Sequence, residues 1–228
     1  MNAASAAGRR TFRNLAVTVG AGQALAIHLS YLLAARMEHV PWCMPYWENC
    51  SSISAAGRHM PEALLFKVTM FPLAVLVILY WRTAREVLDS TAAAGRGSAG
   101  MVRLGTAAAV LLIVYTALLG IGGDVQRQLR HAAVILSFAL TYLAQLQITR
   151  AALAAGAGLY SRPARWFLLV LSLAALAVGI GNVLAQAWYP GFHRVDNAIE
   201  WNLALLLNAY FLVTALVRCE PAQREPSE

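Results

Sequence analysis

The side chains best suited to chemistry in this chain gather in one polar run near its end. The run reads His193-Arg194-Val195-Asp196-Asn197-Ala198-Ile199-Glu200 and leads into a long apolar stretch. If it is helical, His193, Asp196 and Glu200 share a face, because residues three and four positions apart are neighbours. A carboxylate at the mouth of an apolar segment is costly, so by default it marks a functional site. The alternative is that Glu200 lies about one turn inside the helix end and stays hydrated.

A second candidate is His131, which opens another apolar segment. A histidine oriented by a carboxylate is the minimal equipment for general-base catalysis on water or a hydroxyl group. If the fold joins the two helix ends, His131 and Glu200 form such a catalytic pair, and Glu62 and Asp124 lie beside them. The alternative is a structural pair that satisfies itself and pins two helices together. No recognised nucleophile motif accompanies the pair.

Arginines near these groups suit a phosphate, since a guanidinium binds its oxygens bidentately. The predicted substrate-binding residues are therefore Glu62, Asp124, Arg58, Arg130, His193, Arg194 and Asp196. A catalytic zinc site needs about three histidines on facing helices. Only His131 and His28 lie on such helices, so neither a metal nor another cofactor is predicted.

The composition places these residues in a membrane protein. Of 228 residues, 59% are hydrophobic and only 13% are charged, whereas soluble domains are nearer half apolar and a quarter charged. The net charge of +7 comes from basic residues beside apolar segments. That distribution is an orientation signal, and nucleic acid is not an expected partner.

Six segments are long enough to cross a hydrocarbon core, which takes about 20 residues. They span 14–35, 63–81, 104–122, 131–149, 166–187 and 198–217. We therefore predict an all-α, polytopic bundle of six transmembrane helices. Small residues such as Gly105 and Gly179 predict close helix packing within it.

Basic residues orient the predicted bundle. Twelve lie in the two tails and in connections 82–103 and 150–165, against six on the other side, which predicts that both termini are cytoplasmic. One transmembrane domain, 14–217, then lies between cytoplasmic tails 1–13 and 218–228. The predicted location is the plasma or inner membrane, or the ER and Golgi, with most histidines on the outer or lumenal face.

The outer loop 36–62 contains Cys43 and Cys50. Two nearby cysteines on an oxidising face predict a disulfide. The alternative is a metal site that these cysteines share with His39 and His59. That site lacks the usual CxxC pair, so the disulfide is preferred.

The same loop carries the run Ser52-Ile53-Ser54-Ala55-Ala56-Gly57, followed by Pro61-Glu62 and Leu65-Phe66. Together with Arg130-His131 before Ser137-Phe138, and with Glu200-Trp201, it resembles the DRAM/Frag/Sfk family over roughly residues 14–217. That family consists of six-helix membrane proteins and includes a lumenal GPI-anchor remodelling factor. The tryptophan-rich segment 42–48 and the Arg58-His59 pair depart from the family pattern.

The resemblance implies binding, and in an enzymatic form remodelling, of a phospholipid or GPI-type lipid at the outer or lumenal leaflet. Membrane lipids are then the expected partners; protein partners are unknown. The alternative function is a non-enzymatic membrane organiser that acts through lipid distribution or protein partners. A transporter is disfavoured, because the inner halves of the segments offer almost no polar path.

Overall fold

The computed structural model describes residues 3–90, 98–155, 158–188 and 196–218. These ranges contain eight helices and, apart from one isolated bridge between Tyr160 and Val217, no β-structure. The helices are α1 (Ala3–Arg36), α2 (Pro45–Glu48), α3 (Ile53–Ala56), α4 (Glu62–Asp89), α5 (Ser98–Leu118), α6 (Asp124–Ala154), α7 (Arg162–Trp188) and α8 (Asp196–Thr214). The predicted all-α fold is confirmed.

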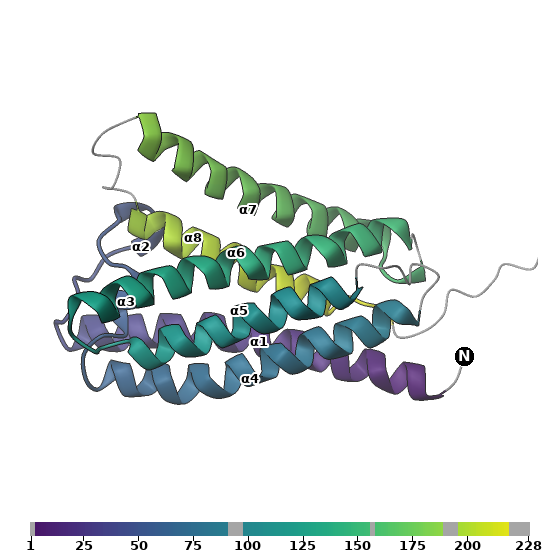
Figure 1. The fold of residues 1–228 in the computed structure, drawn as a ribbon, viewed down its shortest axis with the longest axis horizontal. Helices are drawn as coiled ribbons and strands as arrows, with labels where there is room; N and C mark the ends of the chain where they lie inside the picture. Colours follow the sequence, from purple (N-terminus) through teal and green to yellow (C-terminus); the bar gives the residue numbers. More distant parts are fainter. Residues whose placement is uncertain (1–2, 91–97, 156–157, 189–195, 219–228) are drawn as a thin grey trace, which may run out of the picture.

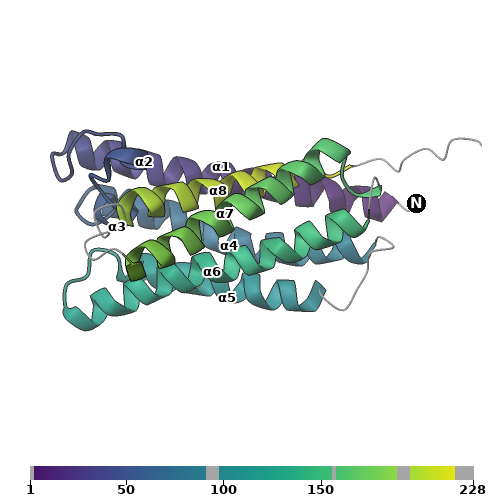
Figure 2. The ribbon, with the colours of Figure 1, turned by 90° about the horizontal axis from the view of Figure 1, so that it is seen from above.

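The six long helices form an up-and-down bundle (Figures 1 and 2). The end of α8 returns to the end of the bundle where α1 begins. There, Arg9 Nη1 donates to the carbonyl of Arg218 at 2.7 Å. The short helices α2 and α3 lie at the opposite end, beside the start of α8 (Figure 1).

Five of the helices, α1, α4, α5, α6 and α7, are long and apolar enough to cross a membrane. The helix α8 has 19 residues and is not one of these five. Each predicted segment corresponds to one long helix, but most of the helices run further than the apolar segment. For example, α6 begins at Asp124 rather than at 131, because a helix continues into polar residues that hydropathy assigns to a loop.

Aromatic side chains fill the core near the end of the bundle where the chain begins. The rings of Tyr80 and Phe211 are 4.9 Å apart, and so are those of Tyr80 and Trp81. A Cβ atom at Gly105 would overlap the indole of Trp81. The glycine therefore lets α5 approach α4 at this ring, as predicted from its small size.

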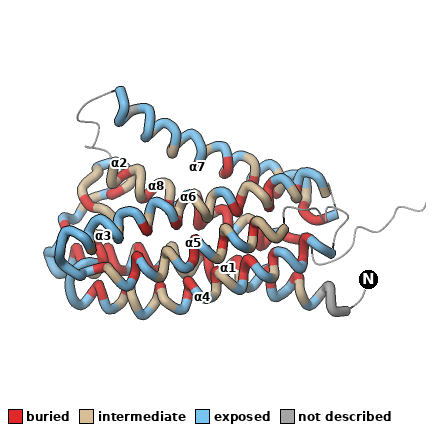
Figure 3. The backbone as a smooth tube through the Cα atoms, viewed as in Figure 1, coloured by how far each residue is buried: buried red, intermediate tan, exposed pale blue. Residues whose placement is uncertain are grey.

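The second half of α7 leaves the bundle. None of its described side chains after Ala175 is buried, and Figure 3 shows this part as exposed and half-buried turns. A Cβ atom at Gly179 or Gly181 would meet nothing within 4 Å. The prediction that Gly179 mediates close packing was wrong for this chain, because α7 diverges from its neighbours before that residue.

Candidate functional site

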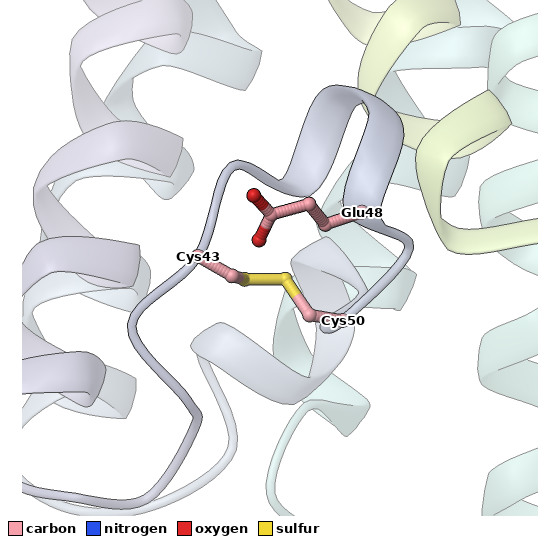
Figure 4. A group of neighbouring side chains, drawn as sticks. All are labelled: Cys43, Glu48 and Cys50. Atoms are coloured by element: carbon pink, nitrogen blue, oxygen red, sulfur yellow. A yellow bond between two sulfur atoms is a disulfide. The ribbon is translucent and has the colours of Figure 1, made fainter.

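The loop 36–62 contains a disulfide bond between Cys43 and Cys50, as predicted. The hydroxyl of Tyr31 on α1 holds the first half of this loop: it accepts from the Cys43 amide at 2.9 Å and donates to the Cys43 carbonyl at 2.7 Å. Figure 4 shows the Glu48 carboxylate beside the disulfide. The two sulfurs are bonded to each other and offer no thiolate, so these residues form a closed loop rather than a metal site.

This loop is fastened onto the start of α8. Two stretches that are about 150 residues apart in sequence therefore meet at one place. The hydrogen bonds run from the Ala198 amide to Asn49 Oδ1 (2.9 Å), from Asn197 Nδ2 to the Asn49 carbonyl (3.0 Å), from Trp201 Nε1 to the Ser51 carbonyl (2.9 Å) and from Asn202 Nδ2 to the Tyr46 carbonyl (2.8 Å). The bond to Ala198 satisfies one of the free amides at the helix N-terminus.

Aromatic rings surround the buried indole of Trp201 and lock this junction. The rings of His28, Tyr31 and Tyr46 lie 5.5, 5.7 and 5.6 Å from it. His28 donates from Nδ1 to the Ala24 carbonyl at 2.6 Å, and its Nε2 lies 2.7 Å from the Tyr46 hydroxyl. Burial raises the pKa of Tyr46, so its phenol stays protonated and donates a hydrogen bond to His28 Nε2. The histidine is thus part of the scaffold.

Glu200 directly precedes Trp201 on α8 and contacts the start of α3. The backbone N–H of Ile53 hydrogen-bonds its carboxylate. The side chain lines a cavity of about 70 Å³ between α1, α4, α5, α6 and α8. Most of the lining is apolar, and its polar members are Gln23, Tyr115, Ser137, Thr141, Glu200 and Asn208. Glu200 is therefore a half-buried carboxylate that lines this cavity at the start of α8.

Tyr115 is the cavity residue that the sequence did not single out. Its hydroxyl is buried and has no hydrogen-bond partner among the described residues. Glu200, Arg58 and Arg130 are all close enough to act on it electrostatically. No pattern in the sequence distinguishes this tyrosine from others in apolar segments, because its role depends on which way α5 turns it.

The predicted catalytic pair is not joined. His131 is exposed, and within the described ranges it makes no hydrogen bond or ion pair with Glu200. Asp124 is also exposed and pairs with Arg127 at 2.6 Å, away from the cavity. Asp196 accepts from Gln186 Nε2 at 2.9 Å. Of the predicted substrate-binding arginines, Arg58 is exposed and Arg130 half-buried.

Two of the predicted site residues, His193 and Arg194, lie outside the described residues.

A histidine–carboxylate pair does occur, but at another place. Glu62, the first residue of α4, is fully buried, and its Oε1 lies 2.7 Å from His39 Nδ1. The imidazole of His59 lies beside that of His39, with ring centres 4.9 Å apart. Sequence reasoning included Glu62 and missed His39 as its partner. The available signal was that both lie in the same connection, 36–62.

No protein-family model matches this chain, and neither a curated protein nor a solved structure shows a significant match to it. The resemblance to the DRAM/Frag/Sfk family therefore remains a prediction from the motifs.

Proposed function

We propose that the protein crosses the membrane six times, with both termini in the cytoplasm, and binds a phospholipid or GPI-type lipid in the cavity beside Glu200. The observation that carries this proposal is the carboxylate of Glu200 in a mostly apolar cavity within the bundle. Ionisable groups are expensive inside a membrane protein and are found there mainly where they serve a function.

The lining suits an amphiphilic ligand. Its apolar walls favour methylene groups, and its polar groups, including Tyr115 and Asn208, suit a hydroxyl or an ester. Arg58 and Arg130 lie on the Tyr115 side, where guanidinium groups are suited to a lipid phosphate. A volume of about 70 Å³ holds roughly two water-sized groups. Only the linkage region of a lipid enters it, and the rest stays in the bilayer.

The enzymatic form of the proposal adds cleavage or transfer of an ester, with His131 and Glu200 as the catalytic pair. Its requirement is that His131 reaches the bound lipid. The second candidate is a non-enzymatic organiser that binds the lipid without changing it. One observation favours this candidate: His131 is exposed and, among the described residues, makes no hydrogen bond to Glu200.

Native mass spectrometry of the purified chain tests lipid binding. We expect one class of lipid to be enriched over the bulk membrane composition, and Glu200→Gln to lose it while the melting temperature stays within a few degrees. The matched variant His131→Ala separates the two forms. It should leave the lipid bound in both cases. A wild-type turnover of the lipid that this variant abolishes would support the enzymatic form. A wild-type protein without an enriched lipid would contradict the proposal.

Thiol labelling tests the proposed topology. The chain has three cysteines, and two of them form the disulfide, so Cys219 is the remaining candidate for labelling. Because it follows α8, a maleimide that cannot cross membranes should label it only after the cells are permeabilised. Labelling of intact cells would place the C-terminal tail on the outer side and overturn the six-span orientation.

A further inference from the structure

A second group of ionisable side chains lies outside the cavity, at the outer end of the bundle. His39 follows α1, His59 precedes α4, and Glu62 opens α4. None of the three lines the cavity that contains Glu200. Two imidazoles from separate parts of this loop therefore lie side by side, and a carboxylate holds one of them, at a place that the proposed function does not use.

We propose that His39 and His59 bind a divalent transition-metal ion of the zinc class, with Glu62 holding His39 in place from behind. This inference is independent of lipid binding at Glu200. Imidazole nitrogens are good ligands for zinc and its neighbours in the first transition row.

The distance between the two rings suits a shared ion. A zinc–nitrogen bond is 2.0–2.1 Å, so the ion lies about 3.2 Å from the centre of each ligating ring. Two rings at a tetrahedral angle around one ion are then about 5.2 Å apart between centres. The observed separation of His39 and His59 is 4.9 Å. The ring separation is therefore compatible with a shared ion, which also requires one nitrogen of each ring to turn toward it.

Glu62 provides the orientation that a ligating histidine needs. Its Oε1 lies 2.7 Å from His39 Nδ1, which places the proton on Nδ1 and leaves the lone pair of Nε2 for the ion. Histidines that bind metals almost always donate their second ring N–H to a carboxylate, a carbonyl or water in this way.

The carboxylate of Glu62 provides a second, independent observation in favour of a cation at this place. Glu62 is 0% exposed, and its Oε2 has no hydrogen-bond partner in the part of the chain that the structure describes. A buried charge with half of its acceptor capacity unused is costly. A dication bound to His39 would offset that charge through the imidazole.

The site is open on its outer side. The side chain of His39 is 31% exposed and His59 is exposed. Two protein ligands leave two coordination positions for water or an anionic oxygen, one more than in catalytic zinc sites with three protein ligands. The site is thus suited to an ion that binds an external oxygen ligand.

Metal titration of the full chain in detergent, after removal of bound ions with a chelator, tests the proposal. We expect Zn²⁺ to bind one ion per chain by calorimetry, and Co²⁺ to give a visible absorption band that Zn²⁺ displaces. His39→Ala and His59→Ala should each remove the band. Glu62→Gln, which keeps an acceptor for His39, should weaken binding by about 10–100-fold.

His131→Ala is the control, because it removes an exposed histidine from the same end of the bundle and should leave the titration unchanged. Equal losses in His131→Ala and His59→Ala would reveal only non-specific binding to surface histidines and overturn the site. A wild-type chain without saturable binding of either ion would also overturn it. If Glu62→Gln fails to fold, His59→Ala still decides, since its side chain is exposed.

Discussion

Asn49 is the residue on which the contact between the outer loop and α8 most depends. It follows α2 with φ 54°, a left-handed conformation that asparagine tolerates better than most residues. Its Oδ1 accepts from the Ala198 amide at 2.9 Å, and its carbonyl accepts from Asn197. A side chain from a distant loop thus caps the helix that carries Glu200.

Three substitutions separate the contributions of Asn49. Alanine loses the cap, worth about 1 kcal/mol, and adds about 1–2 kcal/mol of left-handed strain, so it should destabilise by about 2–3 kcal/mol in total. Glycine loses the cap and relieves the strain, but gives up backbone entropy of about 0.5–1 kcal/mol. Its total cost is therefore about 1.5–2 kcal/mol. Aspartate keeps the acceptor and adds a negative charge near the helix N-terminus, so it should stay within about 0.5 kcal/mol of wild type.

Two measurements check this order. Equilibrium unfolding with SDS in mixed micelles, followed by circular dichroism, gives the free-energy differences. Hydrogen exchange at the Ala198 amide gives the local effect, and we expect faster exchange in the alanine and glycine variants but not in the aspartate variant. The reasoning fails if Asn49→Ala and Asn49→Asp are equally stable, or if exchange at Ala198 is the same in all variants.

Three further outcomes are expected in the same unfolding assay. Gly105→Ala should destabilise the protein by about 1–3 kcal/mol, because the new methyl group overlaps the Trp81 ring. Gly179→Ala adds a methyl group that meets nothing within 4 Å, so it should be neutral or stabilise by up to about 1 kcal/mol. Equal effects of the two substitutions would show that the ring contact does not govern stability. Cys43→Ser should destabilise the protein by about 2.5 kcal/mol, from the entropy of closing so short a loop. If the variant stays less stable than wild type after the wild-type disulfide is reduced, the loss has another cause. Tyr210→Phe removes a hydroxyl that donates to a buried carbonyl at 2.6 Å and should cost about 0.6 kcal/mol, the average for such bonds within membranes; no loss would mean that the carbonyl finds another donor.

The sequence by itself determined the helical class, the long apolar helices and the disulfide. Each of these follows from local information: a run of apolar residues is visible without knowing its neighbours, and Cys43 and Cys50 are only seven positions apart. It also identified Glu200 as a residue of interest, since a carboxylate in an apolar segment stands out wherever the segment lies.

Only the tertiary structure decided which of these residues meet. In the structure, His39 rather than His131 pairs with a carboxylate, that of Glu62. Tyr115 lines the cavity, and Asn49 hydrogen-bonds the start of α8. Such contacts depend on the rotation of each helix about its own axis and on which helix a loop packs against. A change of one residue in helix register turns a side chain by about 100°, and hydropathy does not record that rotation.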